Sequence, residues 1–304
     1  MFAKKLPKIS EDRQEDEYKK LLVLFRKFLK VRSIEDKWCE LEAMMEERAT
    51  HLIHHAIDGL EISYDKAIQI LESDPRELSD YELNLRTSIF AAIDNLVDFA
   101  VAEEYRMASK LPDWGESLYD DEEDDDDNGD YHEEIEETED EEMLAPYIKV
   151  NKLYNNTYAR VEDLDVKYAM IIAASYALFR SGTVLIYMTQ GDHRVRPWHA
   201  ALEGYSAPKE LFPDWMIPPI EAACRCYLEE DWESNIFSKV KNSLPSPQMP
   251  FWFDRTYKES VAKGGRIFSD EHPYFQMDAI NLDRLRDIAN RIKKSIMSNG
   301  RHTD

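Results

Sequence analysis

The stretch YAMIIAASYALFRSGTVLIYMT, residues 168–189, contains a long apolar run, a glycine and a short β-rich run in succession. The apolar run at 168–179 is too short to cross a bilayer core of about 30 Å, so we predict a buried helix over residues 163–180. Gly182 follows, and glycine readily adopts the left-handed conformation that closes helices. Residues 184–189 are then predicted as a strand. This succession predicts an α+β fold.

The residues before this stretch have a helical pattern from 17 to 108. Apolar residues recur every three or four positions, as in amphipathic helices, at Leu21, Leu24, Phe25, Phe28 and Leu29 and again at Leu41, Met44, Met45, Leu52, Ile53 and Ala56. The sequence SDYE at 79–82 has the form of a capping box, so a helix should begin there. We expect residues 1–110 to form a helical domain.

Three histidines, His51, His54 and His55, fall on the second of these helices. His51 and His55 are four residues apart, which places both on one helix face, where they could share a metal ion. No glutamate follows His51 as it does in the HExxH motif of zinc proteases. We therefore expect ordinary surface or packing histidines.

An acidic segment follows the helical half. Residues 120–142 contain 17 Asp or Glu and no Lys or Arg, and they carry most of the net charge of −24. Self-repulsion and scarce apolar residues predict a disordered, solvated insert over 111–147. Asp124 and Asp126 resemble the start of a calcium loop, but Ile135 stands at the twelfth position, where a carboxylate is required. We favour a plain linker over an acidic arm that binds a basic partner.

Composition also argues against nucleic-acid and membrane partners. The rest of the chain is only mildly acidic, which argues against a large phosphate-binding surface. The first residues, MFAKKLPKISEDRQEDE, lack the apolar core of a secretion signal, and no membrane partner is expected. The three cysteines, Cys39, Cys224 and Cys226, cannot form a disulfide framework, so a reducing compartment fits.

The C-terminal part alternates irregular and regular segments. CRCYL at 224–228 is predicted as a second strand, and the aromatic segment at 242–253 as irregular. A final amphipathic helix is predicted through Leu282, Leu285, Ile288, Ala289, Ile292 and Ile296. Residues 284–301 include six basic residues. A basic helix end is usually solvated, although it is also the best candidate for touching DNA.

The loop TQGDHRVRPWHAALEG, residues 189–204, concentrates both charge signs, two imidazoles and an indole. The guanidinium groups of Arg194, Arg196 and Arg225 can bond the unpaired carbonyls of an irregular loop, and Asp192 can offset their charge. We expect these residues to serve the fold rather than catalysis. Removing Arg196 should then cost a few kcal/mol, as for a buried charged network.

One group of residues has metal-ligand chemistry. His199, Cys224 and Cys226 offer the soft donors that zinc prefers, and Asp192 or His272 could complete four ligands. However, the two cysteines lack the usual two-residue gap, and cysteine is often simply buried. We therefore expect no cofactor, with buried thiols and a hydrogen-bonded histidine, and zinc is the alternative. The motifs of zinc deaminases, phosphate-binding loops and nucleophile elbows are all missing from the sequence.

Three segments in order, GDHRVRPWHAALEG, WMIPPIEAACRC and GGRIFSDEHPYF, resemble the phage Mu protein F-like family of minor head proteins, over about residues 184–277. The resemblance assigns a structural-motif role to Asp192, Arg194, Arg196, Pro197, His199, Pro218, Pro219, Arg225, His272, Pro273, Tyr274 and Phe275. The usual Asn-Gly before the C-R-C sequence is replaced by residues 220–223.

The resemblance implies a small, irregular α+β C-terminal domain at 148–304, closed by a helix. It also implies a virion component in the phage head, present in the bacterial cytoplasm during assembly. Such a protein is not an enzyme, associates with the portal and other head proteins, and acts in head morphogenesis or DNA handling. Whether it touches packaged DNA stays open. The alternative is a metal-dependent enzyme or effector carried with the phage and built on His199, Cys224 and Cys226.

Overall fold

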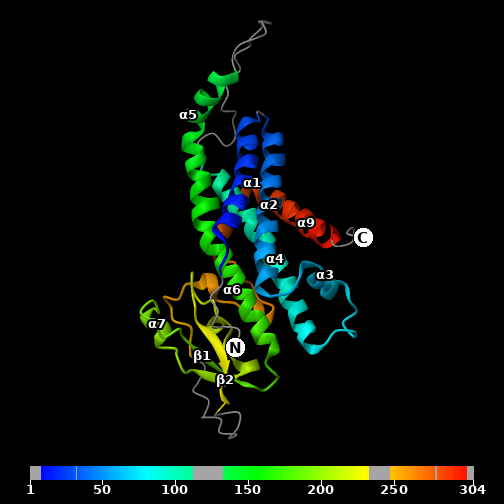
Figure 1. Ribbon diagram of the computed structural model, residues 1–304, viewed down its shortest axis with the longest axis vertical. Coiled ribbons are helices and arrows are strands. Elements are labelled where there is room, and N and C mark those ends of the chain that lie inside the picture. Colours follow the sequence, from blue (N-terminus) through cyan, green and yellow to red (C-terminus); the bar gives the residue numbers. More distant parts are fainter. Residues whose placement is uncertain (1–7, 32, 112–132, 233–246, 278, 300–304) are drawn as a thin grey trace.

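Long helices form a bundle, and a small sheet lies at one end of it (Figure 1). The computed structural model describes residues 8–31, 33–111, 133–232, 247–277 and 279–299. The bundle contains α1 (Glu11–Lys30), α2 (Ile34–Gly59), α4 (Asp80–Ala108), α5 (Glu133–Lys152) and α6 (Ala159–Leu178). Helix α2 packs against α1, α4 and α6, and the short α3 (Tyr64–Glu72) packs against α4. The predicted mainly helical α+β fold is confirmed.

Serine side chains begin four of these helices. Ser10, Ser33, Ser63 and Ser79 each accept a hydrogen bond from a backbone N–H of the first turn, which would otherwise lack a partner. Ser79 and Glu82 form the predicted capping box at the start of α4. The helix starts are therefore encoded locally.

A short π-helix, Leu153–Tyr158, joins α5 directly to α6. The predicted buried helix at 163–180 is confirmed as most of α6. The predicted disordered insert at 111–147 needs correction, because residues 133–147 belong to α5. Residues 112–132 of that insert lie outside the described residues.

The sheet has three antiparallel strands in the order β2-β1-β3. The central strand β1 (Val184–Met188) confirms the prediction for 184–189, and β2 is Ser206–Pro208. Leu185 lies opposite Ala207 on one side and Glu230 on the other. Strand β3 is Tyr227–Glu230, so the prediction of a strand from Cys224 was wrong at its start. Cys224 instead closes a turn, with its N–H bonded to the carbonyl of Glu221.

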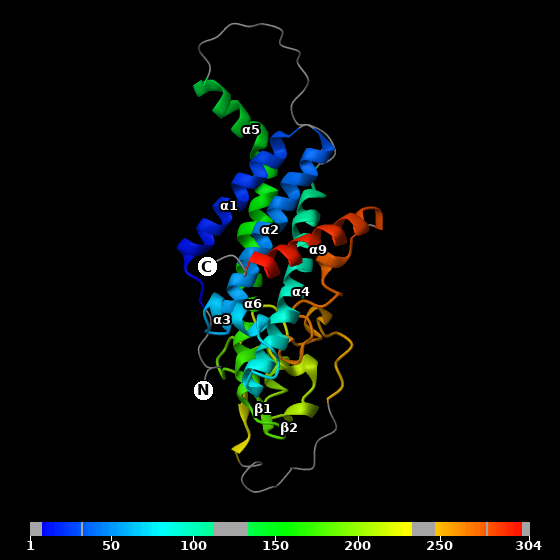
Figure 2. The ribbon, with the colours of Figure 1, turned by 90° about the vertical axis from the view of Figure 1, so that its right-hand side faces the viewer.

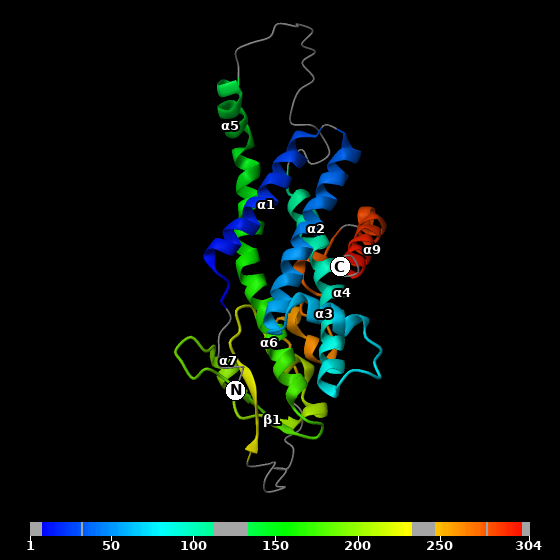
Figure 3. The same cartoon turned by 45° about the vertical axis from the view of Figure 1, so that its right-hand side comes forward.

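Two apolar cores meet on α6. This helix runs from the helical bundle to the sheet (Figure 3). One face of α6, including Val166 and Met170, packs into the core of the bundle. Another face, including Tyr168 and Ile172, covers the sheet and its loops. The chain then returns to the bundle core after Phe253, so the predicted C-terminal region 148–304 contributes to both cores.

The predicted final helix is α9 (Leu282–Asn299), which crosses α4 (Figure 2). Several of its basic residues form ion pairs with acidic residues of α2 and α4, as in Arg291–Glu42 and Lys293–Asp98. The basic face predicted to be solvated is thus partly neutralised by the bundle. Among the described residues, none of the helices combines the length and apolar character that a membrane span requires.

Candidate functional site

The 189–204 loop connects β1 to β2. Gly191 and Gly204 have positive φ angles of 65° and 85°, which favour glycine at both ends of the loop. Between them, Pro197 begins the short helix α7 (Pro197–Ala200). This helix turns His199 inward, and the His199 side chain is 2% exposed.

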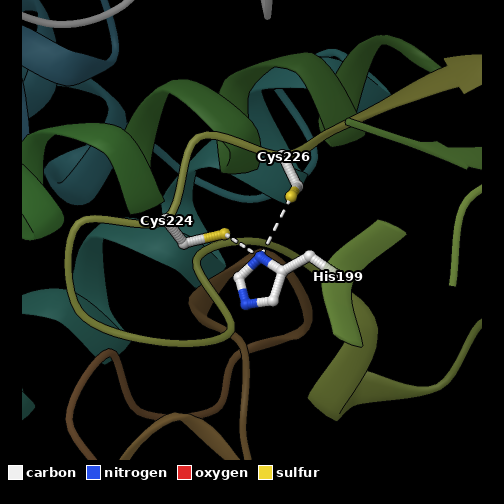
Figure 4. Close-up of side chains that lie close together, drawn as sticks. All are labelled: His199, Cys224 and Cys226. Atoms are coloured by element: carbon white, nitrogen blue, oxygen red, sulfur yellow. Dashed lines mark hydrogen bonds between the residues drawn. The ribbon is translucent and has the colours of Figure 1, made fainter. Parts of the chain in front are cut away.

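The chain before β3 supplies the two cysteines, Cys224 and Cys226, each 3% exposed. Because β3 pairs with β1, this segment lies beside the 189–204 loop at one end of the sheet. His199 Nδ1 lies 3.3 Å from the sulfur of Cys226 and 3.8 Å from that of Cys224 (Figure 4). Burial raises the pKa of the Cys224 thiol, whereas a hydrogen bond from Cys224 lowers the pKa of Cys226. Cys226 is therefore the thiol that ionises more easily.

Glu221 is the centre of the polar contacts around this group. Its carboxylate accepts hydrogen bonds from Trp198 Nε1 and His199 Nε2, both at 3.1 Å, and pairs with Arg196 Nε at 3.2 Å. Arg196 also donates to the carbonyl of Ala222 at 2.8 Å. The sequence did not point to Glu221, because its partners Trp198 and His199 lie 23 and 22 positions away along the chain.

A second ion pair joins the same two segments. Arg225 donates two hydrogen bonds of 2.7 Å to the carboxylate of Asp192. This bond holds the pKa of Asp192 well below its usual range. Asp192 also accepts a hydrogen bond from the backbone N–H of Arg194. The Arg194 side chain is exposed and forms no hydrogen bond or ion pair with another side chain or carbonyl in the described part of the chain. The structural role expected of Asp192, Arg196 and Arg225 thus matches their contacts, and that of the Arg194 side chain does not.

The remaining predicted residues divide between two places. Pro218 and Pro219 are buried in the segment that leads to Glu221. His272 lies against Phe99 of α4, with ring centres 4.9 Å apart, and accepts the N–H of Tyr274. The third motif therefore packs in the bundle core, with Pro273, Tyr274 and Phe275 in the turn that follows His272.

This placement corrects only the two candidates for a fourth ligand. Among the described residues, the group with clustered donor atoms at this end of the sheet is His199, Cys224 and Cys226 alone. Asp192 is engaged by Arg225, and His272 belongs to the other core. Neither of them completes four ligands.

The helical bundle contains a charged cluster that the sequence did not reveal. Arg48 of α2 is 1% exposed and donates to three carboxylates, at 2.7 Å from Glu103, 2.6 Å from Asp163 and 3.3 Å from Glu162. Burial raises the pKa of Glu103 and Glu162. On a surface helix such residues normally face solvent, so nothing in their spacing indicated burial.

The three histidines of α2 have separate surroundings. His51 Nε2 lies 2.8 Å from Glu47, and His55 Nε2 lies 2.9 Å from Glu17 of α1. His54 is exposed. His54 has a surface position and His51 a packing position, as the sequence predicted. His55 instead lies with Glu17 and Asp163 in a group whose donor atoms could hold a metal ion, and His51 does not belong to that group.

The arrangement at His199 allows two kinds of chemistry. Cys226, His199 and Glu221 have the connectivity of an activated cysteine nucleophile, but both Cys226 and His199 are buried from any substrate. The same three donor atoms could instead hold a soft metal ion. A cavity of about 760 Å³ lies elsewhere, between the start of α4 and the end of α6, and none of these residues lines it.

No protein-family model, curated protein or solved structure matches the chain.

Proposed function

We propose that this chain is a structural minor head protein of a tailed phage. In this role it resides in the phage head, associates with the portal and other head proteins, and acts in procapsid assembly or in DNA packaging or ejection. The support from the sequence is the order of the three motif segments within residues 184–277.

The observation that carries the proposal is the bonding between the first two motif segments. Asp192 pairs with Arg225, and Glu221 receives Arg196 and His199. Charged side chains of each segment are therefore bonded to the other segment. Residues that hold an irregular domain together have contacts of this kind. Such a domain suits a protein that acts by assembly and not by catalysis.

The alternative, a metal-dependent enzyme or effector, is less well supported. It would need His199, Cys224 or Cys226 to reach a substrate, and all three are at most 3% exposed. A catalytic metal needs a coordination position open to substrate or water. Burial at this level favours a structural role for the group.

A null allele in the phage that encodes the chain tests the proposal, together with quantitative mass spectrometry of purified heads. We expect the chain in wild-type heads at a copy number near that of the portal and far below that of the major capsid protein. Null phage should produce aberrant or DNA-free heads, and complementation with the wild-type gene should restore them. Absence of the chain from purified heads, with normal heads in the null phage, would overturn the proposal.

A further inference from the structure

We propose that His199, Cys224 and Cys226 bind one zinc ion, which ties the 189–204 loop to the chain before β3. The inference goes beyond the head-protein role and does not depend on it, because it rests on the geometry of these side chains. It reverses the expectation of metal-free thiols that their sequence spacing favoured.

The distances between the donor atoms suit tetrahedral zinc. With Zn–N bonds of about 2.0 Å and Zn–S bonds of about 2.3 Å, a tetrahedral ion separates nitrogen from sulfur by about 3.5 Å. The two distances from His199 Nδ1, 3.3 Å to Cys226 and 3.8 Å to Cys224, lie on either side of this value. All three donor atoms lie within 4.8 Å of one another. A zinc ion therefore fits among them with small side-chain adjustments.

Glu221 orients the histidine as a zinc ligand requires. A metal-bound histidine almost always donates its other ring N–H to a carboxylate or carbonyl, which fixes its tautomer. His199 Nε2 makes this bond to Glu221 at 3.1 Å. The Nδ1 atom, which then carries the lone pair, faces both sulfurs (Figure 4). One thiol can donate a proton to this lone pair, whereas a zinc ion engages the nitrogen and both sulfurs together.

The charge of the donor set suits a buried zinc ion. Two thiolates neutralise the ion, so the complex with a neutral imidazole carries no net charge in a site that water barely reaches. Thiolate and imidazole are soft donors that select zinc over magnesium or calcium. Outside the ligand set, the negative charge of Glu221 is balanced by Arg196.

Tyr187 of β1 supplies an independent observation. Its buried hydroxyl interacts with the sulfur of Cys226. A phenol that donates to a ligand sulfur stabilises the thiolate, which is the form of cysteine that binds zinc.

Native mass spectrometry of the full-length chain from zinc-replete cells tests the proposal. We expect one zinc ion per chain, retained in Cys39→Ser and lost in Cys224→Ser and Cys226→Ser. Cys39 is the matched control because it is exposed on α2, away from this site. Glu221→Gln should weaken zinc affinity by about 10–100-fold while keeping one site at saturating zinc.

Measurements on the wild-type chain keep the test decisive if the cysteine variants fail to fold. Replacing zinc with Co²⁺ should produce the absorption bands of tetrahedral thiolate coordination, and a chelator should lower the melting temperature. A zinc-free chain from replete cells that shows no such bands with Co²⁺ overturns the proposal. Zinc retained in folded Cys224→Ser and Cys226→Ser also overturns it, because the ion would then be bound elsewhere.

Discussion

Glu221 is the residue on which the contacts of the 189–204 loop converge. It binds the side chains of Arg196, Trp198 and His199, so one carboxylate positions the ion pair, the indole and the imidazole. Arg196 and Arg194 lie two residues apart in this loop, yet only Arg196 has side-chain partners in the described structure. The two arginines therefore form a matched pair for a stability test.

Arg196→Ala should lower the free energy of unfolding by about 1–2 kcal/mol, because it removes a hydrogen bond to a carbonyl and one partner of Glu221. This loss is smaller than expected for a buried network, since the Arg196 side chain is 36% exposed. Arg194→Ala should change stability by less than about 0.5 kcal/mol. Urea unfolding of both variants measures the difference, and equal losses would contradict the assigned contacts.

Arg48 is the most deeply buried cation among the described residues, and it balances several carboxylates in the bundle. Arg48→Met should cost about 3–5 kcal/mol, because the carboxylates of Glu103 and Asp163 lose their positive partner while remaining buried. The control is Arg26→Met at an exposed position of α1, which should be nearly neutral. Chemical denaturation followed by circular dichroism provides the measurement. A neutral Arg48→Met would mean that the carboxylates are already protonated.

At the scale of elements, α6 joins the two cores through Asp165. Its buried carboxylate accepts the N–H of Ala223 and the hydroxyl of Tyr257, both at 2.9 Å. Ala223 precedes the cysteines, whereas Tyr257 belongs to the bundle core. Burial raises the pKa of Asp165 to about 7, opposed by these two hydrogen bonds and by the charge of Arg196.

The raised pKa of Asp165 predicts a pH-dependent stability. A carboxyl with a higher pKa in the folded state than in the unfolded state holds its proton more tightly when folded. Its contribution is full below the unfolded value of about 3.9 and is lost as the pH rises through about 7. Wild type should lose on the order of a few kcal/mol more than Asp165→Asn between about pH 4 and about pH 8.

Urea unfolding across this pH range compares the two proteins. Asp12→Asn replaces an exposed carboxylate of α1 and serves as the control, so its curve should follow that of wild type. Parallel curves for wild type and Asp165→Asn would show that Asp165 titrates at an ordinary pH.

At the scale of the whole molecule, the C-terminal helix α9 packs against the N-terminal half of the chain. Leu285, Ile288 and Ile292 of this helix are at most 3% exposed and belong to the bundle core that begins in α1. The C-terminal helix thus completes the N-terminal half. The acidic segment, in contrast, is rich in charge and poor in apolar residues.

Two deletions should therefore differ sharply. Truncation after residue 277 removes α9 and exposes apolar core whose burial is worth roughly 1.5–3 kcal/mol per large side chain, a large part of a typical total stability of about 5–15 kcal/mol. We expect loss of the cooperative thermal transition. Deletion of residues 120–132, which are almost entirely polar, should leave the melting temperature nearly unchanged. Calorimetry of both proteins checks this, and a large loss in the second deletion would contradict it.

The sequence by itself determined most of the long helices and the central strand. The spacing of apolar residues predicted α1, α2 and α9, the capping box at Ser79 predicted the start of α4, and the apolar run and the β-rich run predicted α6 and β1. These features depend on residues within a few positions of one another, since helix hydrogen bonds, caps and strand propensity act over that distance. The strand expected at 224–228 began too early, because pairing with β1 and not local composition decides where β3 starts.

Only the tertiary structure decided which distant residues meet. Glu221 joins His199 across 22 positions, and Arg48 reaches Asp163 across 115. It also separated His272 from the cysteines by packing it on Phe99 of α4. Such pairings depend on how the loops and helices pack, and the same residue types occur on solvent-facing surfaces of many helices. The burial of these residues follows from the fold as a whole, so no local sequence pattern predicts the pairings.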